Sequence, residues 1–127
     1  MGCGRVGALV ATALWEEGHQ VVVLDANQES LRRLPEDLQQ EAIVGDGTLE
    51  EDLRKGGIEN IDAFVAVSTG DTANILAAQM AEHVFRVNKV ICRIDDTARY
   101  EIYTELGLRA VSSTQLLSNL ILQTVHS

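Results

Sequence analysis

The chain has 127 residues, of which 46% are hydrophobic and 4% aromatic, enough for one domain with an aliphatic core. Its net charge of −9 comes from 10 basic and 19 acidic residues, which makes nucleic acid and anionic membranes poor partners for the isolated domain. No apolar run reaches the length of a membrane span, and the N-terminus lies inside a glycine motif rather than a signal peptide. We therefore expect a soluble, cytoplasmic protein.

Strands and helices alternate along the whole chain. In chain order, we predict a helix over 8–17, a strand over 20–25, a short helix over 27–34, a strand over 41–46, a helix over 48–57 with Thr48 as its N-cap, a strand over 61–68, a helix over 71–85, a strand over 88–95, a helix over 97–107, a short strand over 108–113 and a strongly apolar helix over 114–125. This alternation, with near-continuous apolar strands, predicts an α/β fold with a doubly wound parallel sheet and helices on both faces. Residues 1–127 form a single domain in this interpretation.

The first residues, MGCGRVG, place Gly2, Gly4 and Gly7 at the G-x-G-x-x-G spacing of a dinucleotide-binding loop. A helical pattern follows at once, and the next strand ends in Asp25, which lies 21 residues after Gly4 (25 − 4). In dinucleotide folds a carboxylate at about this offset of ~20 residues binds the ribose. The alternative is a purely structural turn between a strand and a helix. The context favours a nucleotide-binding loop.

The strand that normally precedes such a loop has no room here, because only Met1 comes before Gly2. In this fold the first strand lies in the middle of the sheet, where its neighbours need its backbone hydrogen bonds. We therefore expect that the natural chain extends upstream and that the first strand is truncated before Gly2.

With these residues in view, the sequence resembles the nucleotide-binding domain of cytoplasmic potassium-transport regulators of the Trk, Ktr and RCK type, called the TrkA-N or KTN domain. The resemblance covers essentially the whole chain. It rests on several short motifs in the right order, namely GCGRVG with an arginine after the second glycine, HQVVVLD, VGDGT with Gly47 in place of the usual alanine, AVSTGDTANILAAQMA, and VICRIDD with Cys92 in place of alanine.

The resemblance implies a Rossmann-like three-layer fold and a role for each matching residue. The glycines with Val6 would cradle phosphates, Arg5 would add charge to them, and Asp25 would hold the adenosine ribose. The remaining residues implied in cofactor binding are Asp46, Gly47 and Thr48 beside the adenine, Ser68 and Thr69 toward the phosphates or nicotinamide, and Arg93 near the site or at a subunit contact.

Some of these side chains also have structural interpretations. Asp46 is a common turn residue, Ser68 is able to satisfy a strand end, and Arg93 is able to pair with Asp95. Asn74 is better explained by hydrogen bonding at a helix start than by ligand contact. Cys3 and Cys92 lack metal-site spacing, so we expect buried reduced thiols, with a disulfide as the minor alternative.

No histidine, lysine or tyrosine stands where a dehydrogenase needs a proton-transfer group, and no substrate domain is evident. We therefore assign no catalytic residue and no metal, and favour a non-enzymatic sensor over the alternative of an NAD-binding oxidoreductase fragment. The resemblance implies that NAD(H) or ATP/ADP binding regulates a membrane potassium channel or transporter. We expect NADP(H) to bind poorly, because Asp25 repels a 2′-phosphate and the nearest arginines, Arg32 and Arg33, follow on the next helix.

The helix predicted over 114–125, TQLLSNLILQTV, is apolar around more of its circumference than one packed face requires. In the family that the chain resembles, the corresponding helix crosses to a partner subunit. We therefore expect a homodimer or a larger assembly of dimers.

Overall fold

The computed structural model describes residues 1–127 and contains five short strands, six α-helices and two 3₁₀ helices. In chain order these are α1 (Arg5–Glu16), β1 (Leu24–Asp25), η1 (Gln28–Arg33), α2 (Glu36–Glu41), β2 (Ile43–Val44), α3 (Glu50–Lys55), η2 (Ile58–Asn60), β3 (Ala63–Ala66), α4 (Asp71–His83), β4 (Lys89–Arg93), α5 (Thr97–Glu105), β5 (Ala110–Val111) and α6 (Ser113–His126). No helix combines the length and the apolar character that crossing a membrane requires.

All strand pairs are parallel, which confirms the predicted α/β class. β1 pairs with β2 in one sheet, and β3, β4 and β5 follow one another in a second sheet. Met1 and Gly2 connect the two sheets. The Met1 amino nitrogen donates to Val65 O at 2.8 Å, Val67 N donates to Met1 O at 2.8 Å, and Gly2 N donates to Leu24 O at 2.9 Å.

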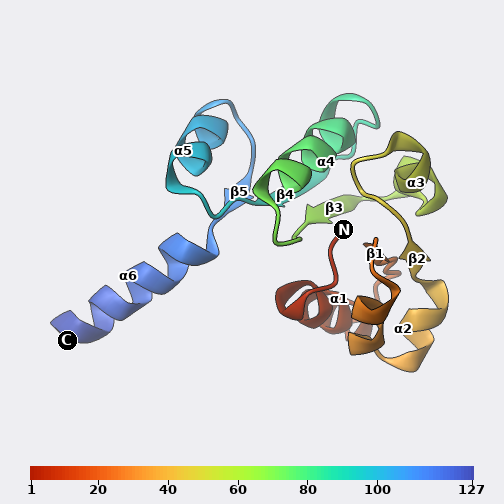
Figure 1. The fold of residues 1–127 in the computed structure, drawn as a ribbon, viewed down its shortest axis with the longest axis horizontal. Helices are drawn as coiled ribbons and strands as arrows, with labels where there is room; N and C mark the ends of the chain where they lie inside the picture. The colour runs from red at the N-terminus through yellow and green to blue at the C-terminus, as the bar shows by residue number, and fades with distance from the viewer.

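The first two residues therefore lie where the central strand of a doubly wound sheet belongs, between the second and fourth strands of the usual order. Figure 1 shows α1 on one side of β3 and β4 and α4 on the other, so that helices cover both faces.

The observed strands are shorter than predicted, most clearly at β1. The sequence predicts a strand over 20–25, but only Leu24 and Asp25 have ladder geometry. Upstream of them, one backbone bond to a neighbouring strand is made, from Ile43 N to Val23 O at 2.8 Å, and Val22 is 47% exposed. An apolar run becomes a regular strand only where neighbouring backbone supplies a continuous ladder.

The helix boundaries bring three corrections. The predicted N-cap Thr48 is wrong, because α3 begins at Glu50 with Leu49 as its N-cap and no side-chain capping bond. Thr48 instead bonds to Asp46 through both its amide and its hydroxyl. The helix predicted over 27–34 is a 3₁₀ helix, capped by the Asn27 side chain. The sequence analysis also missed α2, which follows Pro35 directly.

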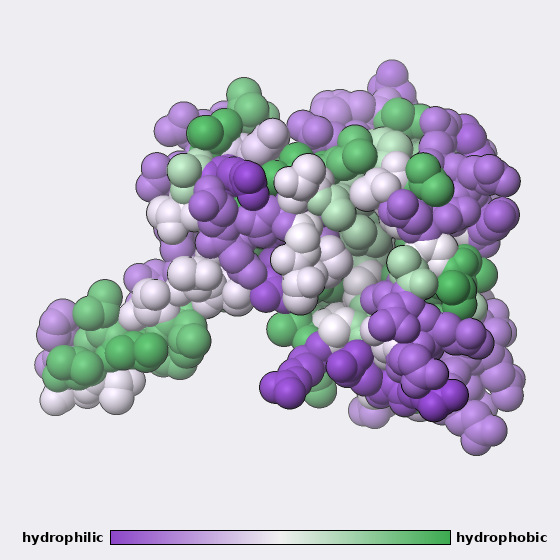
Figure 2. Space-filling view, viewed as in Figure 1, coloured by the Kyte–Doolittle hydropathy of each residue, from purple (hydrophilic) through white to green (hydrophobic).

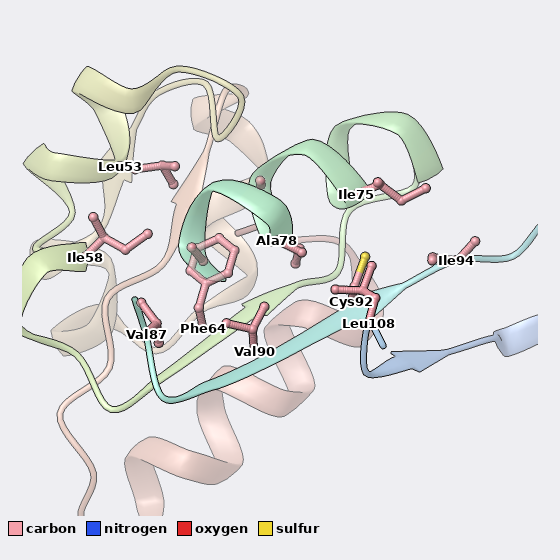
Figure 3. Close-up of a cluster of buried hydrophobic side chains, with 13 residues drawn as sticks. Leu53, Ile58, Phe64, Ile75, Ala78, Val87, Val90, Cys92, Ile94 and Leu108 are labelled. Atoms are coloured by element: carbon pink, nitrogen blue, oxygen red, sulfur yellow. The ribbon is translucent and has the colours of Figure 1, made fainter. Parts of the chain in front are cut away.

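Two hydrophobic clusters form the core. The larger one packs α4 against one face of β3 and β4, and Figure 3 shows Phe64, Val90 and Cys92 beneath Ala78 and Ile75 of that helix. The smaller cluster lies between α1 and the β1–α2 segment and consists of Cys3, Ala8, Ala11, Val23, Leu31, Leu34 and Leu38. Both cysteines are buried and unpaired. Burial, together with the nearby Asp71 and Glu82 carboxylates, raises the pKa of the Cys92 thiol to about 12.

Helix α6 extends away from the rest of the fold (Figure 1). None of its residues is buried, and its apolar side chains form a continuous hydrophobic surface in Figure 2. The most exposed of them, each more than half exposed, are Leu116, Leu117, Leu120, Ile121, Leu122 and Val125.

Candidate functional site

The glycine loop needs glycine at two of its three positions for steric reasons. Gly2 has a φ of +101°, and a Cβ there would lie 2.5 Å from Ser68 N and 2.8 Å from Ser68 Cα. A Cβ on Gly7 would collide with the carbonyl oxygen of Gly2. Gly4 is different, because no atom lies within 4 Å of its Cβ direction. The middle glycine therefore leaves open space over the loop, where a ligand backbone can approach.

Helix α1 begins in that open space. Its N-cap is Gly4, which offers no side-chain capping bond, and its first turn contains no acidic residue. The first backbone bond of the helix runs from Ala8 N to Gly4 O, so the amides of Arg5, Val6 and Gly7 have no partner within the helix. Arg5 is exposed and adds a positive charge. Free amides, the helix dipole and a cation together favour an anion such as phosphate.

Asp25 lies directly against this loop. Its Oδ2 accepts a hydrogen bond from Cys3 N at 2.7 Å, and its Oδ1 accepts one from Asn27 N at 2.8 Å. Each carboxylate oxygen still has a lone pair available for a further donor, such as a ribose hydroxyl. The predicted juxtaposition of the glycine loop and Asp25 is thus present in the structure.

The position of Arg33 adds to the sequence analysis. We expected no arginine beside Asp25, because the nearest ones, Arg32 and Arg33, follow on the next helix. Arg33 instead turns back, and its Nη1 donates to Cys3 O at 3.3 Å. Arg32 points into solvent and pairs with Glu29 at 3.1 Å. A one-residue difference on η1 separates the two, and the sequence gives no signal for which of them faces the loop.

Asp46, Gly47 and Thr48 form a tight turn after β2. Asp46 Oδ1 accepts from Thr48 Oγ1 at 2.6 Å and from Thr48 N at 2.8 Å, and these two bonds lower the pKa of the Asp46 carboxyl. Gly47 is buried, and a Cβ there would collide with the side chain of Met1. The turn therefore lies beside the first residue of the loop, with the Asp46 carboxylate exposed.

Ser68, at the end of β3, is part of a buried polar network. Its hydroxyl donates to Asn74 Oδ1 at 2.6 Å, and the Asn74 amide nitrogen donates to Ser68 O at 2.9 Å and to Arg93 O at 3.0 Å. Asn74 is fully buried, in line with its expected role at the helix start. Thr69 follows in an exposed bend. The Ser68 main chain lies against Gly2, while the Asn74 side chain connects the end of β3 to α4 and β4.

Arg93, at the end of β4, pairs with Asp95, which was one of its two expected roles. Arg93 Nε and Nη2 both lie 2.9 Å from Asp95 Oδ2, and Nη2 also donates to Ser113 Oγ at 3.4 Å. Asp95 Oδ1 in turn accepts from Ser113 N at 2.9 Å and Ser113 Oγ at 2.7 Å. Partial burial raises the pKa of Asp95, but the hydrogen bonds from Arg93 and Ser113 outweigh it, so the net pKa is lowered.

This network lies at the edge of an apolar groove of about 370 Å³. The groove connects the first turn of α1 to the base of α6 and is lined by Val6, Val67, Arg93, Val111, Ser113, Leu116, Leu117 and Leu120. The sequence analysis named Asp95 only as a possible partner of Arg93 and did not find Ser113 or Asp71. Asp71 accepts hydrogen bonds from the amides of Asp95 and Asp96 at 2.9 Å and 2.8 Å.

The predicted residues thus gather at one edge of the fold, where the carboxyl ends of parallel strands meet. Gly2, Ser68 and Asp25 are in contact through the loop, Gly47 packs against Met1, and Arg93 shares the groove with Val6. Thr69 makes no hydrogen bond to the loop.

Comparison with known proteins identifies relatives of this chain. The TrkA-N domain family matches residues 1–114. The Trk system potassium uptake protein TrkA of Streptomyces coelicolor is 42% identical over 123 residues, covering 97% of this chain and 55% of that protein. A TrkA homolog of Pyrococcus abyssi is 40% identical over 106 residues, covering 84% of this chain and 47% of that protein. The chain therefore spans about half the length of these relatives.

The fold also has a counterpart among solved structures. The NAD(P)-binding domain of an exopolyphosphatase-related protein from Archaeoglobus fulgidus superposes with a TM-score of 0.77, covering 98% of this chain and 93% of that one. Its sequence is 21% identical, so the likeness concerns the fold alone. It confirms the Rossmann-like architecture that the sequence predicts.

Proposed function

Because the chain belongs to the TrkA-N domain family, we propose that it is a nucleotide-sensing regulatory domain that controls a membrane potassium channel or transporter. The observation that carries the proposal is the uncapped start of α1 above Gly4, with the Asp25 carboxylate fixed beside it. Family membership favours this function over the alternative of an oxidoreductase fragment.

In this proposal the phosphates bind the amides of Arg5, Val6 and Gly7, and the Arg5 guanidinium adds a charge-assisted contact. The adenosine ribose binds Asp25. The adenine lies toward the Asp46–Thr48 turn, and the far end of the ligand lies toward Ser68, Thr69 and Arg93. The chain supplies binding and orientation and needs no proton-transfer group of its own.

We propose NAD(H) or ATP/ADP as the ligand. The Asp25 carboxylate accepts hydrogen bonds from a ribose diol and repels a 2′-phosphate. Arg33 contacts Cys3 at its carbonyl oxygen and is the cation that would bind a 2′-phosphate. A preference for NADH over NADPH therefore requires that the repulsion of the 2′-phosphate by Asp25 is stronger than its attraction to Arg33.

A competition titration tests ligand choice. NADH, NAD, ATP, ADP and NADPH are titrated by calorimetry into the unmodified chain, Asp25→Ala and Arg33→Gln. We expect tighter binding of NADH than of NADPH. Asp25→Ala should weaken adenosine ligands and narrow that difference, and Arg33→Gln should widen it. Equal affinities of the unmodified chain for NADH and NADPH would refute the role given to Asp25.

Control of transport requires that the ligand favours one of two arrangements of the subunits. We propose that α6 provides the contact with a second copy, since its apolar surface is exposed along its whole length. The partner transporter would hold the domain at the cytoplasmic face of the membrane. Co-purification of a membrane potassium transporter with this chain, measured with and without nucleotide, tests this step.

A further inference from the structure

Cys3, between the first two glycines of the loop, is held at three points. Its side chain is fully buried in the smaller core cluster. Its N–H donates to Asp25 Oδ2 at 2.7 Å, and its carbonyl oxygen accepts from Arg33 Nη1 at 3.3 Å. The second oxygen of Asp25 is occupied by Asn27 N at 2.8 Å, which fixes the orientation of the carboxylate.

The two residues on either side of Cys3 have the least conformational restraint of their own. Gly2 adopts a left-handed φ of +101°, and Gly4 has no neighbour in its Cβ direction. Glycines lose more backbone entropy on ordering than other residues, so a loop built from them is ordered only if other contacts hold it. The contacts of Cys3 supply that restraint.

We propose that Asp25 and Arg33 are positioning residues that clamp the main chain of Cys3 and set the glycine loop in its phosphate-binding conformation before any ligand arrives. The proposal rests on the proposed function and gives Asp25 a second task besides the ribose. It also gives a task to Arg33, which the nucleotide-binding motif does not include.

The negative charge of Asp25 allows an experiment to distinguish the clamp from a role that is confined to binding the ribose. Tripolyphosphate carries phosphates but no ribose, and the negative charge of Asp25 repels it. If Asp25 acted on the ribose alone, Asp25→Ala would leave tripolyphosphate affinity unchanged or raise it. If Asp25 holds the loop, the same substitution lowers that affinity, because the amides must then be ordered on binding.

The first measurement is amide hydrogen exchange of the unliganded chain by NMR. We expect the Cys3 amide to exchange about tenfold faster in Asp25→Ala, because a hydrogen bond to a charged acceptor is lost. Asp25→Asn keeps one acceptor oxygen and should recover part of the protection. Arg33→Gln should also accelerate Cys3, whereas the matched control Arg32→Gln should not, since Arg32 pairs only with the exposed Glu29.

Exchange of the Cys92 amide, which bonds to Arg109 O at 3.0 Å, reports whether the rest of the fold is intact. If the Cys92 amide also exchanges faster in Asp25→Ala, that variant is unfolded, and the exchange of the Cys3 amide in Arg33→Gln decides the test. Unchanged exchange at Cys3 in a folded Asp25→Ala or Arg33→Gln variant would overturn the clamp.

The second measurement is calorimetric titration with sodium tripolyphosphate. We expect Asp25→Ala and Arg33→Gln to bind it about fivefold to tenfold more weakly than the unmodified chain, and Arg32→Gln to bind it normally. Tighter or equal binding by Asp25→Ala would overturn the proposal. If the unmodified chain binds neither tripolyphosphate nor NADH, the proposed function fails, and the exchange experiment alone decides the clamp.

Discussion

Replacing Asp95 with alanine should destabilise the fold at the start of α6. The Asp95 carboxylate accepts two bonds from Arg93, both at 2.9 Å, and two from Ser113, at 2.9 Å and 2.7 Å. No other acidic side chain contacts Arg93. Removing the carboxylate therefore leaves Arg93, whose side chain is only 19% exposed, without its counter-charge, and frees the first turn of α6.

The expected loss in the free energy of unfolding follows from these contacts. A hydrogen bond to a charged group contributes about 1.5–3 kcal/mol, and breaking a fully buried ion pair costs about 3–5 kcal/mol. The Asp95 side chain is 27% exposed, so water screens part of the pair. We expect Asp95→Ala to cost about 2–3 kcal/mol at neutral pH.

Urea denaturation of the unmodified chain, Asp95→Ala and the control Asp62→Ala measures this difference. Asp62 is exposed and its side chain makes no hydrogen bond or ion pair, so its replacement should change the free energy by less than about 0.5 kcal/mol. A loss below about 0.5 kcal/mol for Asp95→Ala would refute the reasoning.

The same pair predicts a pH dependence. The folded-state pKa of Asp95 lies below its ordinary value of 3.8, because the hydrogen bonds from Arg93 and Ser113 outweigh burial. Its contribution is therefore present above the unfolded pKa and is lost as the pH falls through the lower folded value. The stability difference between the unmodified chain and Asp95→Ala should shrink below pH 4 and stay constant between pH 5 and 7.

Four further substitutions test the loop and α6. Gly2→Ala should cost about 2–4 kcal/mol of stability, because its Cβ would lie 2.5 Å from Ser68 N. Gly4→Ala should leave the melting temperature unchanged and weaken nucleotide binding, and equal melting temperatures of the two variants would contradict this reasoning. Arg5→Ala should weaken nucleotide binding by about 1–3 kcal/mol with unchanged melting, and unchanged affinity in calorimetry would show that Arg5 is only a surface residue. Leu120→Glu, at a side chain 59% exposed, should abolish self-association in light scattering; a monomeric unmodified chain at high concentration would contradict the dimer.

The fold class could be predicted from the sequence because apolar strands and amphipathic helices differ in period. The strand predicted over 88–95 illustrates this, since Val90 and Cys92 are buried against α4. The strand at 20–25 could not be predicted in length, because its ladder depends on backbone far away in the chain. Thr48 shows a second limit. A threonine before an acidic helix is a good N-cap candidate, but its hydroxyl here donates to Asp46 and the helix begins only at Glu50.

The candidate site was predictable where a motif carries a steric reason. The close approach of Gly2 to Ser68 and of Gly7 to Gly2 explains the glycine spacing, and the end of β1 places Asp25 beside the loop. Arg33 was not predictable, because the direction in which a long side chain leaves a 3₁₀ helix depends on local packing.

The hydrogen bonds that join the two sheets have a consequence for cooperativity. They run through Met1 and Gly2, the segment that leads into the glycine loop, and the two hydrophobic clusters lie largely on different sides of this seam. Opening along this segment would break the backbone hydrogen bonds between the β1–β2 half and the β3–β5 half and favour their unfolding as separate units. A nucleotide seated on the glycine loop would contact Asp25 on one side of the seam and the end of β3 on the other. Ligand binding would therefore merge two unfolding units into one, and sharpen the thermal transition as well as raise its midpoint.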